Sequence, residues 1–416
     1  MINRLFTQLR DTLNDVSFMC THRTKSTYFT RSTCTLDFKL LMAFILQLPQ
    51  GAMQIELNQF FKKFLPSSDP LRAESLQKAR LKIDRSAFTD LIEDSLKTIY
   101  QSPFKNFRGY RVVAVDGSVF EVPTRAEDVF GTLNASDACV AKAQVCALYD
   151  VYNHIILEAE IAPYVTNERK QAVRLIEQLE EKSRETGMEN LYLFDRGFPS
   201  RELIRTLGNS PYIFRVNNAF LAPIKQANQA DQLVPIVDDQ GNQHQVRVVT
   251  IPLPSGEIEK LFSNITDESV TVEDFKALYH QRWGIETRYR TLKSILEIEN
   301  FSSTKMQLIE QDFYATIFIA NLLAVVQNYA DEELSQEKNG LTYEYKTNTN
   351  VAISELRDMV LQVVMSKNPF KKLYIMRKLL DQIKRYVLPI RNNRESTSRK
   401  RKFPCVKFPL NKKGNH

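Results

Sequence analysis

Hydrophobic positions in the first hundred residues recur at the spacing of an α-helix. The two clearest sets are Leu36, Leu40, Leu41, Phe44 and Ile45, and then Phe88, Leu91, Ile92 and Leu96. Residues three and four apart share one face of a helix, so each set predicts an amphipathic helix with one buried side. Proline-rich breaks at 49–51 and 66–70 separate these helices. The pattern predicts a helical region over residues 1–105.

From Tyr110 the pattern changes to short β-branched runs, which are typical of strands. Strands are expected at 111–120, 142–152, 155–162, 190–198 and 212–216, with helices at 167–182 and 201–207. The first three strands form a meander, and the later strands are reached through helical crossovers. This order predicts an α/β (α+β) protein with a mixed sheet in the ribonuclease-H-like order.

The composition of the chain changes several times after residue 219. Residues 220–262 are rich in Gln, Asn, Pro and Val, with turns at 238–241 and 254–256, and favour a β-rich insertion that includes a strand at 245–251. A helix follows over 272–297, then an apolar core helix over 313–329. Residues 332–346 are polar and loop-like, and helices are expected at 353–364 and 369–386.

These changes in pattern and composition predict six consecutive segments. They are a helical N-terminal domain at 1–105, the first part of the core at 106–219, the insertion at 220–262, the second part of the core at 263–330, a helical C-terminal region at 331–390, and a basic tail at 391–416.

Charge is concentrated in the tail. The chain carries a net charge of +7, and residues 391–416 hold nine lysines and arginines against one acid, Glu395. Any basic groove in the body must therefore be local. The tail favours sequence-independent binding of phosphates, with a solvated tail as the alternative. The cationic stretch 75–83 is open to two similar interpretations: a solvated helix face, or a helix that contacts DNA.

The five cysteines are odd in number, scattered and without CxxC spacing, so neither a disulfide framework nor a zinc site is expected. Residues 1–19 contain Asp11 and Asp15 and lack the long apolar core of a signal peptide. The longest mostly apolar runs, 40–48 and 317–326, are too short to span a bilayer. A soluble cytoplasmic protein is the expectation.

One helix carries an unusual stripe of polar residues. Tyr279, Arg282, Glu286 and Lys293 are offset by zero, three, seven and fourteen positions. At about 100° per residue they fall within an arc of roughly 60° on one face of the helix predicted over 272–297. An acid between two cations and a phenol suits a surface that grips a polyanion beside a metal.

Two predicted strands end in an aspartate near a glycine. Asp116 follows Val113-Ala114-Val115, and Asp195 follows Leu193-Phe194. Together with Glu286 they form an oxygen-only set, which Mg²⁺ or Mn²⁺ prefers. Two such ions about 3.5–4 Å apart activate water and stabilise the leaving 3′-oxygen in a phosphodiester displacement. Each acid alone is more simply read as a turn residue or an ion-pair partner, whereas the three with the stripe favour a catalytic site.

These motifs resemble the DDE transposases of bacterial insertion sequences in the IS-four family. The family signature Y-x2-R-x3-E-x6-K is matched by Tyr279, Arg282, Glu286 and Lys293, and the two aspartate motifs by Asp116 in Val115-Asp116-Gly117-Ser118 and Asp195 in Asp195-Arg196-Gly197-Phe198. The resemblance runs from about Leu36 to the tail and includes the β-rich insertion. It implies that Asp116, Asp195 and Glu286 are catalytic and hold two Mg²⁺ or Mn²⁺ ions.

The resemblance also implies DNA contacts. Tyr279, Arg282 and Lys293 are expected to bind phosphates near the transposon end, with Arg290, Arg196 and Trp283 as further candidates. Some relatives form a hairpin on that end and stabilise a flipped base with a tryptophan of the insertion. The only tryptophan here is Trp283 in the signature helix, so another aromatic such as Phe220 takes that role or the role is absent.

The function that follows is metal-dependent cleavage at the element's ends and strand transfer of the exposed 3′-OH into target DNA. The helical N-terminal domain would recognise terminal inverted repeats, and two protomers would pair the ends in the bacterial cytoplasm, at the nucleoid. Two alternatives share these motifs: a ribonuclease-H-like nuclease without strand transfer, and a non-catalytic DNA-binding descendant of a transposase.

Overall fold

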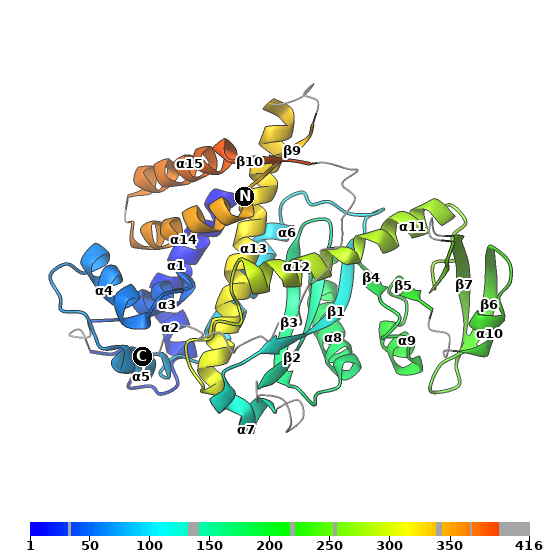
Figure 1. The fold of residues 1–416 in the computed structure, drawn as a ribbon, viewed down its shortest axis with the longest axis horizontal. Coiled ribbons are helices and arrows are strands. Elements are labelled where there is room, and N and C mark those ends of the chain that lie inside the picture. The colour runs from blue at the N-terminus through cyan, green and yellow to red at the C-terminus, as the bar shows by residue number, and fades with distance from the viewer. Residues whose placement is uncertain are drawn as a thin grey trace, which may run out of the picture. The chain divides into compact units, whose positions relative to one another are not determined.

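The structure is a computed structural model of the 416-residue chain. It describes residues 1–31, 35–131, 141–216, 221–252, 256–337, 343–366 and 368–390 (Figure 1). Phe220, Cys34, Cys139, Cys405 and the basic tail 391–416 lie outside these ranges. Contacts divide the chain into two compact units. Of the described residues, those within Met1–Pro103, Glu121–Lys142 and 292–390 form a helical unit, and those within Phe104–Phe120 and Ala143–Thr291 form a sheet unit.

The sheet has eight strands in the order β3-β2-β1-β4-β5-β8-β7-β6. The strands are β1 Arg111–Glu121, β2 Lys142–Asp150, β3 Ile155–Pro163, β4 Asn190–Phe194, β5 Tyr212–Arg215, β6 Asp231–Val237, β7 Gln243–Pro252 and β8 Ile258–Ser263. β4 pairs in parallel with β1 and β5, whereas β2 with β3 and β5 with β8 are antiparallel. This confirms the mixed sheet of ribonuclease-H-like order, and β6 to β8 extend it from β5.

The central strands are apolar because both of their faces are covered. Val112 to Val115 of β1 and all five residues of β4 are buried. Strands covered on both sides read as continuous apolar runs instead of alternating patterns. Across the neighbouring strands the ring of Phe214 stacks on Phe194 and on Phe262, with centroid distances of 4.4 and 5.0 Å. The hairpin of β7 and β8 is thereby packed into the same aromatic core as β4 and β5.

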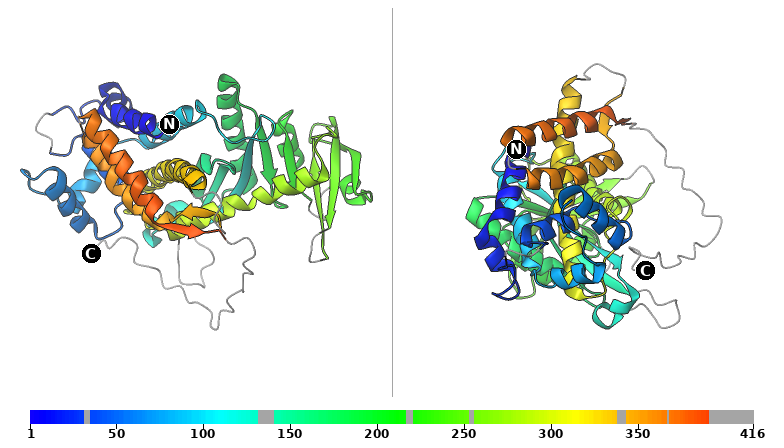
Figure 2. Two further views of the ribbon diagram at one scale, coloured as in Figure 1. Left: turned by 90° about the horizontal axis from the view of Figure 1, so that it is seen from above. Right: turned by 90° about the vertical axis from the view of Figure 1, so that its left-hand side faces the viewer.

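Helices cover the two faces of this sheet. They are α8 Glu168–Thr186, α9 Arg201–Leu207, α10 Ala222–Gln226, α11 Val272–Gln281 and α12 Trp283–Ser294. α8 lies on one face and α11 with α12 on the other (Figure 2, left). The Asn167 side chain caps α8 by accepting from the Arg169 and Lys170 N–H groups, as its sequence predicts, and the helix ends at Gly187 with φ 68°.

The helical unit is built around α13. Its elements are α1 Ile2–Asn14, α2 Val16–His22, α3 Phe38–Leu46, α4 Met53–Phe64, α5 Ala73–Arg80, α6 Ser86–Tyr100, the 3-10 turn Thr124–Ala126, α7 Glu127–Phe130, α13 Met306–Glu337, β9 Tyr345–Thr347, α14 Thr349–Met365, α15 Pro369–Arg385 and β10 Val387–Pro389. β9 and β10 form a separate antiparallel pair.

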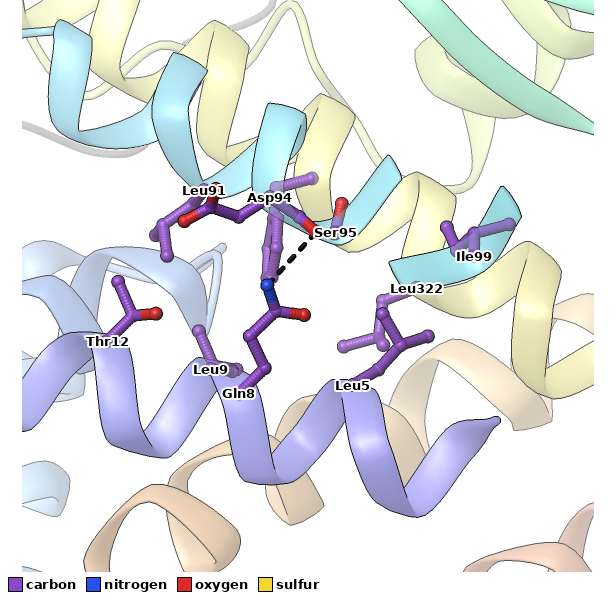
Figure 3. Close-up of a pocket in the computed structure, with 10 residues that line it drawn as sticks. Leu5, Gln8, Leu9, Thr12, Leu91, Asp94, Ser95, Ile99 and Leu322 are labelled. Atoms are coloured by element: carbon purple, nitrogen blue, oxygen red, sulfur yellow. Dashed lines mark hydrogen bonds between the residues drawn. The ribbon is translucent and has the colours of Figure 1, made fainter. Parts of the chain in front are cut away.

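α1 packs against α6 through leucine and isoleucine side chains (Figure 3). Leu5 and Leu9 face Leu91 and Ile99, and Gln8 Nε2 donates to the carbonyl oxygen of Asp94 at 3.0 Å. A gap of about 10 Å³ remains between them. That is about the volume one water needs, so this gap is a packing feature and not a ligand site.

α13 is longer than the apolar pattern predicted. It runs 32 residues, so residues 332–337, expected as loop, continue the helix. Long helix formers such as Glu and Gln sustain it past the point where apolar residues stop. The helix is long and apolar enough to cross a membrane, but its apolar window is entirely buried inside the protein. It is therefore the core helix of this unit, as the sequence indicated for residues 313–329.

Arg80 of the cationic stretch 75–83 lies in neither of the two predicted settings. Its side chain is buried, and it donates to Ser302 Oγ, to Gln311 Oε1 at 3.2 Å and to Asp312 Oδ1 at 2.8 Å. Asp312 also accepts from the backbone N–H and hydroxyl of Ser302. Helical spacing alone did not reveal that this cation faces inward, where it ties α5 to α13.

Arg80→Ala is expected to lower the free energy of unfolding by about 3–5 kcal/mol, because it leaves the Asp312 carboxylate buried without its cation. Equilibrium urea unfolding followed by circular dichroism measures this. Lys78→Ala, on the exposed side of the same helix, is the matched control and should change stability by less than about 0.5 kcal/mol. Equal effects of the two substitutions would contradict the burial of Arg80.

Candidate active site

Strand register brings the two aspartates together. β1 and β4 are parallel, and Val115 is the register partner of Phe194. The next residue on each strand is Asp116 and Asp195 respectively. Neighbouring strands lie about 4.8 Å apart, so the two carboxylates leave the same edge of the core side by side. Asp116 remains within β1, whereas Asp195 begins a turn in which its carbonyl accepts from the Phe198 N–H at 3.1 Å.

The predicted signature helix is two helices that meet at Arg282. α11 ends at Gln281 and α12 begins at Trp283, and Arg282 keeps helical angles of φ −52° and ψ −36°. α11 is anchored at its start by a capping box between Thr271 and Asp274. Because the junction stays helical, Tyr279, Arg282 and Glu286 remain on one face, as predicted from their spacing.

Arg282 is the cation of the site. One Nη of its guanidinium donates to Glu286 Oε1 at 2.8 Å, and the other lies 3.8 Å from Asp116 Oδ2. Its side chain is only 3% exposed. The Trp283 ring lies 4.8 Å from the guanidinium, measured to the centroid. The guanidinium therefore lies against carboxylates from both the strand and the helix.

Arg282 does not fully compensate the negative charge of Asp116. Burial raises its pKa to about 7, and Arg282 only partly offsets this, while the neighbouring carboxylates of Glu168 and Glu286 raise it further. Burial works against the charge on Arg282, but its hydrogen bond to Glu286 and the nearby acids leave its pKa above the ordinary value. A group of acids with one buried cation is a place where further positive charge is favourable.

Two tyrosines flank the acids from the helical side. The Tyr289 hydroxyl donates to the backbone oxygen of Asp116 at 2.8 Å, which ties α12 to this part of β1. The Tyr279 side chain is buried, its hydroxyl has no hydrogen-bond partner among the described residues, and burial raises its pKa. Tyr279 is thus placed beside Arg282 and Asp195, as its electrostatic neighbours indicate.

Sequence reasoning missed the first turn of α8. Glu168 acts electrostatically on Asp116, and burial raises its own pKa, against a hydrogen bond from the Gly117 backbone. Arg169 Nε donates to the carbonyl oxygen of Gly197 in the turn after Asp195 at 2.8 Å. The available signal was positional, since a helix that follows β3 begins at the edge where parallel strands β1 and β4 end.

The remaining predicted residues lie around this group. Lys293 pairs with Glu299 at 3.6 Å. Arg290 is exposed on α12, and Trp283 is 51% exposed. Arg196 is exposed and lines an open cleft of about 570 Å³ together with Arg215, Lys225 and Lys260. Three exposed groups therefore surround the acids, while Tyr279 and Arg282 are buried among them.

The donor set suits a hard divalent ion, since Asp116, Asp195, Glu286 and Glu168 offer only carboxylate oxygens. In the conformation described, no three Asp, Glu, His or Cys side chains among the described residues converge closely enough to hold a metal ion. Arg282 lies between Glu286 and Asp116, where it supplies the positive charge that such an ion would bring. The chemistry of the residues fits the metal, and Glu286 would have to turn from Arg282 to reach it.

A family model described as "Transposase DDE domain" matches residues 107–322, which is more than half of the chain. The chain belongs to the transposase DDE domain family. The transposase InsG for insertion sequence element IS4 of Escherichia coli is 23% identical over 368 residues, covering 82% of this chain and 78% of that protein. The resemblance to the IS-four family and the function of a transposase are confirmed.

Among solved structures, the piggyBac transposase synaptic complex with hairpin DNA is similar. It matches at 12% identity with a TM-score of 0.46, covering 96% of this transposase and 86% of that chain.

Arg282→Met is expected to lower the free energy of unfolding by about 2 kcal/mol, because Glu286 and Asp116 lose a charged donor in a buried place. Urea unfolding measures the change, and Arg282→Lys should recover part of the loss because it restores the charge without the planar fork. Arg290→Met is the control on the exposed face of α12. A loss no larger for Arg282 than for Arg290 would contradict the counter-charge role.

Proposed function

We propose that this transposase cleaves DNA at the ends of its element and joins the freed 3′-OH to target DNA, using Asp116, Asp195 and Glu286 as the catalytic and metal-binding residues. The observation that carries the proposal is the pairing of Val115 with Phe194, which makes Asp116 and Asp195 neighbours, with Glu286 tied to Asp116 through Arg282. The family's activity supplies the reaction, and this arrangement supplies the residues.

Two Mg²⁺ or Mn²⁺ ions held by the three carboxylates would activate the attacking water or 3′-OH and stabilise the leaving oxygen. Tyr289 holds the Asp116 backbone through its 2.8 Å hydrogen bond, and the Gly117 N–H donates to Asp116 Oδ1 at 3.0 Å, so backbone and carboxylate are each held by one hydrogen bond. Arg282 offsets acidic charge while it remains against Glu286. When Glu286 turns from it, its guanidinium is available to a phosphate oxygen, which it binds in a planar two-pronged fashion.

The side chains that are exposed at the surface are the ones expected to contact DNA first. Arg290, Arg196 and Trp283 present charge and an aromatic face on the surface, and suit phosphates and a base respectively. Tyr279 and Arg282 are buried, so they would meet DNA only at the catalytic centre itself. Lys293, now paired with Glu299, would exchange that partner for a phosphate.

The larger assembly follows the same logic. The helical N-terminal domain would recognise terminal inverted repeats, two protomers would pair the element's ends, and the basic tail would add phosphate contacts that depend on salt. Such a protein would work in the bacterial cytoplasm, at the nucleoid.

Asp195→Asn is expected to reduce end cleavage at least about 1,000-fold with Mg²⁺, because a metal-bound transition state loses several kcal/mol of stabilisation. Binding of the same end DNA, measured by fluorescence anisotropy in Ca²⁺, should change less than about threefold. Asp239→Asn, an exposed acid on the loop after β6, is the control. Cleavage within a few-fold of wild type by Asp195→Asn would overturn the assignment.

The same assay separates a transposase that joins ends from a nuclease. Pre-cleaved ends with a free 3′-OH should give joined products with the wild-type protein, and none with Asp195→Asn. Persistent cutting without any joined product from pre-cleaved ends would mean that this chain acts only as a nuclease.

Arg290→Ala is expected to weaken DNA binding and to reduce the slope of log affinity against log salt by about 0.9, the value for one lost phosphate contact. Binding measured between low and moderate salt gives this slope. Lys170→Ala, exposed on α8 on the other face of the sheet, should leave it unchanged. Equal slopes for wild type and Arg290→Ala would remove Arg290 from the DNA surface.

A further inference from the structure

The first turn of α8 reaches the part of β1 that carries Asp116 and the turn that begins at Asp195. Glu168 lies against Gly117, the residue after Asp116, and Arg169 Nε bonds to the oxygen of Gly197, two residues after Asp195. The Asn167 cap fixes the direction in which α8 starts. Two adjacent side chains of one helix thus contact the residues that follow the two proposed metal ligands, one within β1 and one in the turn after β4.

Gly117 is needed here for space. Its backbone angle is an ordinary strand one, so no left-handed conformation calls for glycine. A Cβ built on it would lie 2.1 Å from Glu168 Oε1 and 2.9 Å from Gln144 Nε2. Any side chain at 117 would therefore push the Glu168 carboxylate away from Asp116.

Asp116 and Glu168 share one backbone donor. The Gly117 N–H donates to Asp116 Oδ1 at 3.0 Å, and the same group acts as a hydrogen-bond donor to Glu168. Two carboxylates at one N–H repel each other, and Asp195 adds to the acidic field at Glu168. Either a proton on one carboxyl group or a cation bound between the two would relieve this repulsion.

Other acids of β2, β3 and the turn between them have structural partners. Asp150 accepts from the backbone of Tyr152 and Asn153 in the hairpin turn. Glu158 pairs with Lys182 at 2.6 Å, and Glu160 pairs with Arg174 at 2.9 Å. Glu168 differs from them because its close neighbours are the loops of the catalytic aspartates.

A second feature of the site points to a missing ligand from the opposite side. The Tyr279 side chain is 97% buried (3% exposed), and its hydroxyl has no partner among the described residues. It lies in the field of Asp195 and Arg282. A buried hydroxyl without a partner costs stability, which a hydrogen bond to a bound water or phosphate oxygen would recover.

We propose that Glu168 is a fourth carboxylate ligand of the divalent metal ions, seated against Gly117 beside Asp116. The inference rests on the proposed function, since it needs a metal at Asp116. The Glu168 carboxylate comes from α8, which lies on the other face of the sheet from α12 and Glu286. Acids from the strands and from both helices would then enclose the ions.

The test is Mn²⁺ binding to the full-length protein without DNA, measured by isothermal titration calorimetry and by the loss of the free-ion electron paramagnetic resonance signal. Glu168→Gln keeps the size and hydrogen-bonding of the side chain and removes its charge. It should weaken Mn²⁺ binding about 10-fold, the lower range for groups that support a metal. Glu177→Gln, exposed on the same helix, should leave the affinity unchanged, and circular dichroism confirms that each variant is folded.

Asp195→Asn separates two kinds of failure. If Asp195→Asn weakens Mn²⁺ binding and Glu168→Gln does not, Glu168 is not a ligand although the proposed function stands. If neither variant changes the affinity, the metal site proposed for the transposase is wrong, and the role of Glu168 falls with it.

Gly117→Ala provides an independent variant that leaves every charge in place. Its methyl group should displace the Glu168 carboxylate and weaken Mn²⁺ binding by a similar factor. In a Glu168→Ala background only the end of the flexible Gln144 side chain still lies close to the methyl, so the second substitution should add little to the loss of Mn²⁺ affinity, and the two effects should be non-additive. Fully additive losses would overturn the placement of Glu168 against Gly117 and with it the inference.

Discussion

The contact between Arg282 and the carboxylates of Asp116 and Glu286 is the interaction on which the rest of the site depends. Strand β1 and helix α12 each bring a buried or half-buried acid to the same place. Without a cation between them, two desolvated carboxylates would repel each other and one would bind a proton. Arg282 allows the fold to close over the acids, yet it only partly offsets the effect of burial on the pKa of Asp116, so further positive charge at this carboxylate is favourable, as the proposed metal site requires.

Much of this arrangement could be predicted from the sequence, because the residue pattern along each element indicates where that element leaves the core. The apolar runs before Asp116 and Asp195 predicted two buried strands, and parallel pairing of β1 with β4 then makes the acids neighbours. The expected strand end is found only at Asp195, because β1 continues past Asp116 to Glu121. The helical spacing of Tyr279, Arg282 and Glu286 predicted their common face, which the junction at Arg282 preserves. Such patterns report local geometry, and local geometry determines these three positions.

The parts that could not be predicted depend on contacts between distant segments. Glu168 reads as an ordinary acid in the first turn of a helix, where it favours the helix dipole. Glu168 lies against Gly117 only because the connection from β3 starts α8 at that place, which the sequence does not show. Arg80 belongs to a cationic stretch that was expected either in solvent or against DNA, since periodicity identifies a face but not what lies opposite it. The identity of the residues that support the site was therefore hidden, while that of the acids was visible.

Two buried arginines of this chain show how a structural network differs from a functional one. Arg80 uses all three of its nitrogens on protein oxygens: Nε on Gln311, Nη1 on Ser302 and Nη2 on Asp312. Arg282 is as buried, yet its Nε has no partner among the described residues, and neither has the Tyr279 hydroxyl beside it. Folding selects against such unsatisfied groups because each costs stability. Arg288 and Arg357 also keep side-chain nitrogens without a partner among the described residues, so an unfilled hydrogen bond does not by itself identify a ligand site. Arg282 and Tyr279 differ in lying beside the acids of the proposed site, where a phosphate oxygen would complete both groups under the proposed function.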